Sequence, residues 1–367
     1  MTVRVNKPSF NIREKLSELG RKFGLKGSEL AAAETVQEAR DLVSAGRKNA
    51  LYNGDMQIWQ RGTSFPNGGG GGTANYTADR WNATRYASSE NDVSREDANH
   101  LGFRYCLRSA RGGGDTTTTA RFVSQVLEQK DTWKLRGKYV TFSFYLRVGS
   151  GFNGGLVKSS ITYHTDSARE ERYYYNQFIN GNNTQSQIEH KSLSTDWQRF
   201  THTTYIPDNA QQVGVAIASN ENLPNAVSAD YFEVTGCQLE VGRNATEFEH
   251  RSYGEELALC QRYYGKIRLS NQEWIYNESS THNHKWHQVY IPFSMRANPQ
   301  VDASDVTMGG GVSGLSGTLS SYSPQTPGDT PGRISSRVGM SVSSGTGRAL
   351  YHTDQWNGDY IDLDAEL

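Results

Sequence analysis

The chain has 367 residues, enough for two or three domains, and its formal net charge is −1. So small a net charge gives no electrostatic reason to expect nucleic acid or an anionic membrane as a partner. Hydrophobic residues make up only 35% of the chain, whereas glycine (37), tyrosine (20) and tryptophan (7) are plentiful. This mixture favours β-structure with many loops, in which aromatic side chains supply much of the buried surface.

Cysteine content and apolar segments restrict where the chain folds. Three cysteines are too few for a disulfide framework, which favours a reducing compartment. No stretch approaches the roughly 18 apolar residues of a membrane-spanning helix, and the first residues lack the apolar core of a signal peptide. We therefore expect a protein that folds in a cytoplasm, does not insert into a membrane and is not exported by the usual route.

Residues 1–48 are predicted to form two helices. In the first, apolar residues recur every three or four positions, at Ile12, Leu16, Leu19 and Phe23. The second runs from Glu29 to about Ala45 and has a narrow apolar seam of Ala32, Val36, Ala39 and Val43. An apolar seam this narrow cannot be buried within a single isolated helix and needs a packing partner. It is expected either to join copies of the chain, as in a trimer, or to pack on a larger assembly or on the next domain.

From residue 49 to 254 the apolar pattern has a period of two, beginning with Met56 and Ile58. The clearest strand is Val140–Val148: the residues from Val140 to Val148 at even numbers are apolar, and Thr141, Ser143, Tyr145 and Arg147 face the other way. Further strands are expected at Phe122–Leu127, Ser160–His164, Trp197–Ile206, Val213–Ala218 and Tyr231–Val241. Many short strands without intervening helices predict a mainly β fold, with an antiparallel β-sandwich or jelly roll at 49–254.

The stretch Gly236–Tyr264 is predicted to connect this sandwich to a smaller unit. Its first half, Cys237–Val241, alternates apolar and polar residues as a last strand, and Phe248 is expected to pack beneath it. Its second half, Glu255–Tyr264, has the pattern of an amphipathic helical turn. We expect this stretch to set the geometry between two folded bodies.

Residues 255–367 are predicted to form a smaller β-rich unit. Strand patterns occur at Tyr263–Ser270, Glu273–Asn277, Trp286–Phe293, Val338–Val342 and Ile361–Ala365. Residues 309–336 are rich in Gly, Ser, Thr and Pro and are either a disordered tract or a set of long surface loops.

Several runs, taken together in this order, resemble a recurring module of bacteriophage tail fibres. They are NALYNGDMQIWQRGTSF (49–65), YTADRW (76–81), LRGKYVTFSFYLR (135–147), WQRFTHTTYIP (197–207), QLEVGRNATEFEHRSYGEELALCQRYY (238–264) and the terminal YIDLDAEL. The helical residues 9–49 are similar to the N-terminal attachment region of some cyanophage-type fibres. The resemblance covers residues 1–264 well and residues 265–367 only at their edges.

This resemblance implies a homotrimeric receptor-binding fibre, made in the host cytoplasm and present in the virion. The N-terminal helices would attach it to a tail adaptor, a nozzle or another virion protein. The middle domain would be a jelly roll like those of carbohydrate-binding modules. The C-terminal unit would be a tip that binds a host surface polysaccharide such as lipopolysaccharide.

The sequence predicts no catalytic residues. No credible phosphate-binding glycine fingerprint or serine nucleophile elbow is present. Candidate carboxylates for glycoside hydrolysis exist, among them Asp79, Asp230, Glu233 and Glu240, but Asp79 beside Arg80 and Trp81 is typical of a structural ion pair. Two alternatives stay open: a tailspike-type polysaccharide depolymerase, and a fibre that decorates the capsid rather than the tail.

Two sets of residues in the C-terminal unit are candidates for binding. His282 and His284 form an H-x-H pair, which on a strand would place both imidazoles on one face for a structural metal ion; a solvated loop is the competing interpretation. No cofactor is otherwise expected. Aromatic side chains that could stack on sugars are Trp274, Tyr276, Tyr322 and Trp356.

Overall fold

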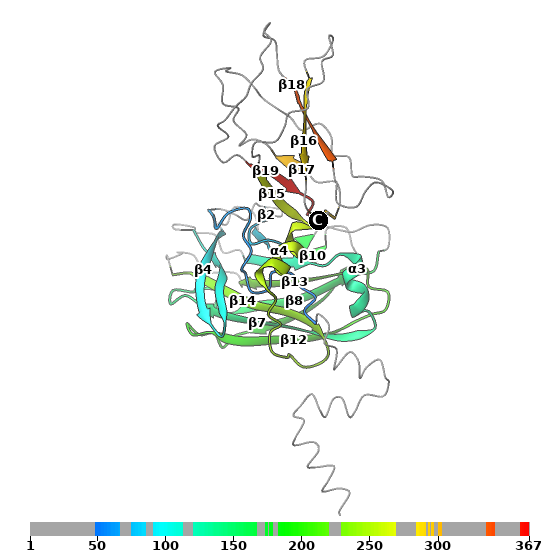
Figure 1. The fold of residues 1–367 in the computed structure, drawn as a ribbon. Helices are drawn as coiled ribbons and strands as arrows, with labels where there is room; N and C mark the ends of the chain where they lie inside the picture. Colours follow the sequence, from blue (N-terminus) through cyan, green and yellow to red (C-terminus); the bar gives the residue numbers. More distant parts are fainter. Residues whose placement is uncertain are drawn as a thin grey trace, which may run out of the picture.

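A computed structural model of the chain describes residues 48–66, 75–85, 91–112, 120–166, 173–174, 176–178, 183–219, 229–268, 284–290, 293, 295–296, 300–302, 335–341 and 360–366. These residues form a mainly β structure in which two antiparallel sheets lie face to face (Figure 1). The fold is a β-sandwich, as the alternating sequence pattern predicts.

The first sheet contains, in the described part of the chain, six strands in the order β1-β4-β5-β14-β7-β12. Their bounds are β1 Ser64–Phe65, β4 Asp92–His100, β5 Phe103–Ala110, β14 Tyr231–Val241, β7 Lys138–Val148 and β12 Gln198–Ile206. Strand β12 lies at one edge of this sheet, next to β7.

The second sheet has the order β11-β8-β13-β6-β3-β2 among the described residues. Its strands are β11 Asn183–His190, β8 Val157–His164, β13 Gln212–Ser219, β6 Arg121–Val126, β3 Asn82–Arg85 and β2 Asn75–Tyr76. The short pair β9 Tyr173–Tyr174 and β10 Gln177–Phe178 packs on the outer side of this sheet, where Tyr173 and Phe178 contact Val126 and Ala216. Part of the second sheet's outer surface is therefore covered by the chain itself.

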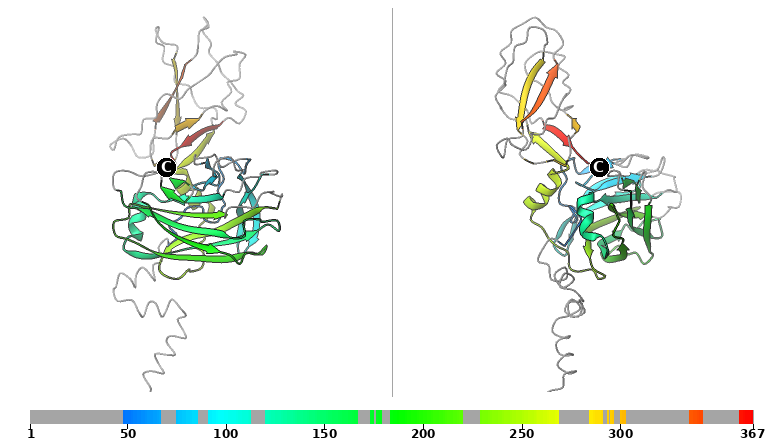
Figure 2. Two further views of the ribbon diagram at one scale, coloured as in Figure 1. Left: turned by 180° about the vertical axis from the view of Figure 1, so that it is seen from behind. Right: turned by 90° about the vertical axis from the view of Figure 1, so that its right-hand side faces the viewer.

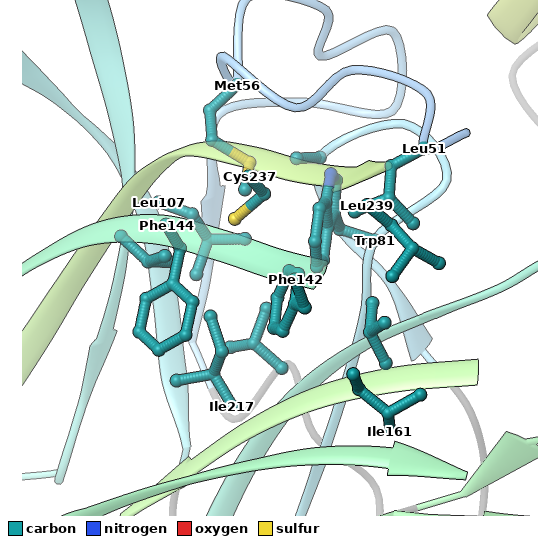
Figure 3. Packing of buried hydrophobic residues seen from close by; sticks show 14 of the residues in the cluster. Leu51, Met56, Trp81, Leu107, Phe142, Phe144, Ile161, Ile217, Cys237 and Leu239 are labelled. Atoms are coloured by element: carbon teal, nitrogen blue, oxygen red, sulfur yellow. The ribbon is translucent and has the colours of Figure 1, made fainter. Parts of the chain in front are cut away.

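The core fills the space between the sheets (Figure 3). Phe142 and Phe144 of β7 point into it with ring centroids 5.0 Å apart, and they meet Ile161 and Ile217 of the second sheet. Trp81 is fully buried beside them and donates its indole N–H to the Asn53 carbonyl at 2.9 Å. Burying one such aromatic side chain stabilises the fold by about 2–3 kcal/mol relative to leaving it exposed.

A bulge in β14 explains why this strand contributes apolar residues to the core along its whole length. Phe232 and Val234 point inward at even positions, whereas Cys237 and Leu239 point inward at odd positions. The pairing of β14 with β7 shifts between Thr235 and Gln238, and Gly236 lies there with φ +61°. One extra residue inverts the alternation of sides, and glycine adopts the left-handed conformation without strain.

The expectation of a strand around Met56 and Ile58 is wrong. Both side chains are buried, but residues 51–60 form turns, with positive φ at Asn53 (51°) and Met56 (56°). The Asn53 amide holds the turn closed by donating to the carbonyls of Ile58 and Asp79 at 2.9 and 3.0 Å. The apolar residues at positions 56 and 58 therefore indicated burial of both side chains, but not a strand.

The described helices are short: α3 Gln129–Thr132, the 3-10 turn η1 Trp133–Leu135, and α4 Tyr253–Gln261. Ser252 caps α4 by accepting a hydrogen bond from the Glu255 N–H at 3.3 Å, and Glu255 and Glu256 occupy its first turn. A helix is therefore present where the helical turn Glu255–Tyr264 was expected, but it ends at Gln261, Tyr264 already belongs to the next strand, and Glu256 and Cys260 are its buried residues. Within the described residues, no helix has the length and apolar character needed to span a membrane.

Beyond α4, strands β15 Tyr264–Arg268, β19 Tyr360–Asp364 and β17 Gln300–Asp302 form a small sheet in the order β15-β19-β17. Figures 1 and 2 show β15 and β19 beside α4 at one end of the sandwich. A separate pair joins β16 His284–Tyr290 to β18 Ser335–Ser341. The last strand of the chain therefore returns to the strand with which the C-terminal unit begins.

Most of the strands expected after residue 120 are present, and the expected strand at Cys237–Val241 is the second half of β14. Phe248 packs against Phe103, with ring centroids 4.9 Å apart in an edge-to-face arrangement, on the outer side of the first sheet. The two N-terminal helices, the strand expected at Glu273–Asn277 and most of the 309–336 tract lie outside the described residues. Jelly-roll connectivity, the domain boundaries and the trimer remain predictions.

Candidate functional site

Most of the binding residues predicted from sequence fall outside the described residues. These are Trp274, Tyr276, Tyr322, Trp356, His282 and the seam residues Ala32, Val36, Ala39 and Val43. His284 is the first residue of β16 and pairs through its backbone with Ser341, but its side chain is not among those described. Among the described residues, no three His, Cys, Asp or Glu side chains lie close enough together to hold a metal ion.

The described surface with the features of a binding site is the outer face of β7 and β12, here called the β7–β12 face. Because β7 sends Val140, Phe142 and Phe144 into the core, the residues between them point outward. Cross-strand pairs on this face are Tyr139 with Tyr205, Thr141 with Thr203, Ser143 with Thr201, and Tyr145 with Arg199. The face thus has two exposed threonines on β12, Thr201 and Thr203, with aromatic rings at each end, whereas Thr141 and Ser143 of β7 are buried.

One end of the face is the tyrosine pair, Tyr139 and Tyr205. Their ring centroids are 5.3 Å apart, and the two residues are 37% and 44% exposed. The guanidinium carbon of Arg243 lies 3.4 Å from the centroid of the Tyr139 ring. A cation stacked on one ring limits its rotation and leaves polar N–H groups beside an exposed aromatic surface.

Between the ends, hydroxyl groups are held in place by the chain that follows β14. Thr141 Oγ1 lies 2.8 Å from Thr203 Oγ1 and donates to the Gly242 carbonyl at 2.9 Å. Thr201 and Thr203 are exposed. Thr141 and Ser143 are themselves buried, so the hydroxyl groups that this face presents to solvent are those of Thr201 and Thr203 on β12.

The other end is the Trp197 cluster, formed by Trp197, His100, Tyr145 and Arg147. The His100 ring stacks on Trp197 at 5.7 Å between centroids and meets Tyr145 edge-on at 5.3 Å. The guanidinium of Arg147 lies 4.7 Å from the Trp197 centroid. Desolvation, and then the nearby charge of Arg147, lower the pKa of His100, so the imidazole tends to be neutral at pH 7.

Beside this cluster, Glu233 is buried between two arginines. Arg108 donates to Glu233 Oε1 from Nε at 2.8 Å and from Nη2 at 2.6 Å, and Arg147 donates to Oε2 from Nε at 2.5 Å. The three residues lie opposite one another on β5, β14 and β7. Both oxygens of this buried carboxylate are occupied by arginine donors, so the three residues join neighbouring strands of the sheet.

The other carboxylates considered from sequence are also partnered. Asp230 lies 3.3 Å from Arg121 and 3.6 Å from Arg111, with all three side chains buried. Glu240 accepts from the Thr246 N–H at 2.7 Å and from its hydroxyl at 2.6 Å. Among the described residues, none of these carboxylates is both exposed to solvent and without an ion-pair or hydrogen-bond partner. None of them is therefore assigned a catalytic role.

Asp79 is structural, but its predicted pairing with Arg80 is wrong. Asp79 accepts from the Gln60 N–H at 2.9 Å and from the Gln60 side chain. Burial raises its pKa to about 6, while the charge of Arg61 acts in the opposite direction. Asp79 and Arg80 are adjacent in the sequence, but their side chains bind different partners.

Arg80 instead connects the sandwich to the last residues of the chain. Its buried guanidinium forms an ion pair with Glu366, donates to the Val126 carbonyl at 2.7 Å and lies 3.6 Å from the centroid of the Tyr263 ring. Arg61 reaches the same segment, 3.1 Å from Asp364. The sandwich and the small sheet are thus joined by ion pairs whose partners are far apart in sequence; Arg80–Glu366 is buried, and Arg61–Asp364 is partly exposed.

Four of the six runs that carry the tail-fibre resemblance, 49–65, 76–81, 238–264 and the terminal YIDLDAEL, meet at this junction. Asn53 N–H donates to Glu256 at 2.5 Å, and Gln60 donates to the Tyr264 carbonyl at 2.8 Å. Arg251 donates to the carbonyls of Asn49 and Leu51 at 2.6 and 3.0 Å. These four runs therefore form a joint between the sandwich and the small sheet, whereas the runs at 135–147 and 197–207 contain β7 and β12 and so include the β7–β12 face.

Comparison with known proteins gives similar folds and no family. No protein-family model matches the chain, and no curated protein matches it. Solved structures with similarity include the enzymatically active domain of tailspike protein 4 of bacteriophage CBA120, at 11% identity and TM-score 0.32, covering 49% of this chain. The chain spans only 21% of that tailspike structure.

Several carbohydrate-binding modules are also similar. One is the C-terminal family 22 module of Xyn10B from Clostridium thermocellum, at 13% identity and TM-score 0.32, covering 47% of this chain and 91% of the module. Another is a family 4 module, at 14% identity and TM-score 0.30, covering 52% of this chain and 98% of the module. At these identities and scores, neither a ligand nor an activity transfers to this chain.

Proposed function

We propose that the chain is a virion fibre protein that binds a host-surface glycan, such as lipopolysaccharide, through its β-sandwich. The observation that carries this proposal is the β7–β12 face, with the exposed tyrosine pair, the adjoining threonine hydroxyls and the Trp197 cluster. Aromatic rings stack on the C–H faces of sugars, and hydroxyl and guanidinium groups bind sugar hydroxyls. An open, elongated face suits a segment of polysaccharide better than a small molecule, which is usually enclosed in a pocket.

The experiment compares binding of bacterial polysaccharides by the wild-type chain and by a Tyr139→Ala/Tyr205→Ala double variant. Loss of both rings is expected to weaken binding by about tenfold or more, since each aromatic contact contributes roughly 0.5–1.5 kcal/mol beyond buried area. Tyr253→Ala is the matched control, because Tyr253 is also an exposed tyrosine but lies on α4.

Unchanged affinity in the double variant would move the site away from this face. The C-terminal unit would then be the next candidate, and Trp274, Tyr276, Tyr322 and Trp356 are the residues to substitute there. This second site remains a sequence prediction for a receptor-binding tip.

The proposal includes a homotrimer with jelly-roll middle domains, attached to a tail adaptor or nozzle protein through the seam residues of the N-terminal helices. Light scattering is expected to give three times the chain mass, and a monomeric mass would refute the trimer. Microscopy of labelled N-termini on the virion would distinguish a tail fibre from a capsid fibre.

We also propose that the chain binds glycan without cleaving it. The partnered state of Asp230, Glu233 and Glu240 supports this view for the sandwich. Incubation with a bound polysaccharide should release no new reducing ends. Their appearance would instead favour the depolymerase alternative.

A further inference from the structure

Arg147 and Arg108 hold the same carboxylate but differ in what remains of their hydrogen-bonding capacity. Both side chains are 29% exposed, and they lie on opposite sides of Glu233. Arg108 uses Nε and Nη2 on Glu233, and its Nη1 lies 3.6 Å from Glu96. Every nitrogen of Arg108 therefore faces a carboxylate of this chain.

Arg147 uses only Nε for Glu233. Within the part of the chain that the structure describes, its Nη1 and Nη2 form no hydrogen bond. A guanidinium with both terminal nitrogens available presents two parallel N–H groups, the geometry that matches a carboxylate in a bidentate pair. The Arg147 side chain as a whole is 29% exposed.

The surroundings of Arg147 suit a sugar that bears an acidic group. The Trp197 ring lies against its guanidinium, 4.7 Å from the ring centroid, and also stacks on His100, so a pyranose would contact the part of this partly exposed ring that these two residues leave uncovered. Arg199 is a further cation on this face, 5.6 Å from the Tyr145 centroid. The Arg199 Nη2 group donates to Ser143 Oγ at 3.1 Å and to the Thr246 carbonyl.

We propose that Arg147 binds the carboxylate of a uronic-acid-type sugar, with Trp197 beside it as the stacking surface. This inference rests on the proposed glycan binding and adds the class of sugar. The ligand on the β7–β12 face would then be an acidic polysaccharide, with a carboxylated residue at the Trp197 cluster and further residues extending along the threonines toward the tyrosine pair.

The test uses the full chain with oligogalacturonate and alginate oligosaccharides, each compared with its carboxyl-reduced form. The wild type is expected to bind at least one acidic oligosaccharide about tenfold more tightly than its reduced partner, the usual effect of a charge-assisted bidentate contact. Arg147→Lys should remove most of this preference, because an ammonium cannot form the planar pair. Arg108→Lys is the matched control and should keep the preference.

Both lysine variants retain a positive charge beside Glu233, and thermal unfolding would show that they fold. If Arg147→Lys does not fold, Trp197→Leu replaces it in the test, since that change leaves all charges in place and should also reduce the preference. Equal binding of acidic and reduced forms, or a preference that survives in Arg147→Lys, would overturn the inference. So would binding of phosphorylated oligosaccharides in place of uronates.

The two proposals fail in different ways. Suppose that acidic and neutral oligosaccharides bind equally well and that binding still requires the tyrosine pair. This result would support glycan binding on the β7–β12 face and would refute only the acidic subsite at Arg147. If the chain bound none of the acidic or neutral oligosaccharides, both the glycan-binding proposal and the acidic-subsite proposal would be refuted.

Discussion

A hydrogen-bonded chain of side chains between the sheets predicts how stability changes with pH. Ser159 Oγ lies 2.9 Å from His190 Nε2 and 3.1 Å from His202 Nδ1, and Ser186 Oγ lies 2.9 Å from His202 Nε2. Burial, and then repulsion from His190, lower the pKa of His202 to about 4. The folded protein therefore holds this imidazole neutral at pH values where the unfolded chain protonates it.

The sign follows from proton linkage. The unfolded imidazole titrates near pH 6.5 and the folded one near pH 4, so the unfolded state binds more protons between these values. Stability contributed by the neutral imidazole is present above pH 6.5 and is lost as pH falls. The loss amounts to about 2 kcal/mol by pH 5 and about 3 kcal/mol by pH 4.

Urea unfolding of the wild type and of His202→Asn at pH 7, 5 and 4 measures this contribution. The variant has a constant cost from its lost hydrogen bond, but the free energy of unfolding should fall less with pH than in the wild type, by about 2 kcal/mol at pH 5. Comparison of the two proteins cancels Asp55 and Asp79, whose pKa values burial raises to about 6 and which act in the opposite direction. Ser186→Ala is the control, since it leaves the imidazole buried.

Parallel pH curves for the wild type and His202→Asn would refute this reasoning. They would mean that His202 has the same proton affinity in the folded and the unfolded states. A Ser186→Ala protein that lost the pH dependence as completely as His202→Asn would show that the hydroxyl contact, and not burial, keeps the imidazole neutral.

Three further predictions concern the joint and the core. Gly236→Ala should lower the free energy of unfolding by about 2 kcal/mol in chemical denaturation, because a Cβ there would lie 2.7 and 2.8 Å from two aromatic rings at φ +61°; a neutral change would contradict the bulge geometry. Glu366→Gln should cost about 3 kcal/mol, because it leaves the buried Arg80 charge uncompensated, whereas the exposed Glu247→Gln should cost little; equal effects would contradict the buried ion pair. All three thiols should resist a thiol reagent until the protein unfolds, since burial raises the pKa of Cys106, Cys237 and Cys260; rapid reaction of the native protein would argue against this core.

The sequence predicted β7 in detail because the alternation of apolar and polar residues there matches the alternation of buried and outward side chains in the strand. Even positions of Val140–Val148 are apolar and enter the core, and Tyr145 and Arg147 were correctly expected on the opposite side. The line of outward residues on the candidate face was therefore readable from periodicity. Its function was not, because periodicity does not show that Tyr139 pairs with Tyr205 across two strands.

Other elements were missed for physical reasons. Strands β4 and β11 consist largely of polar residues, so no apolar alternation indicated them. The parity change within β14 depends on one bulge at Gly236, which a regular pattern cannot show. The Arg80–Glu366 ion pair joins residues 286 positions apart, and spacing in the sequence gives no information on such a contact.

The most direct test of glycan binding on the β7–β12 face is hydrogen–deuterium exchange of the full chain with and without a bound bacterial polysaccharide. Protection on binding is expected in peptides covering Lys138–Val148 and Gln198–Ile206, with little change in Asn183–His190 of the other sheet. Protection confined to residues 265–367 would contradict the account and would assign glycan binding to the C-terminal unit.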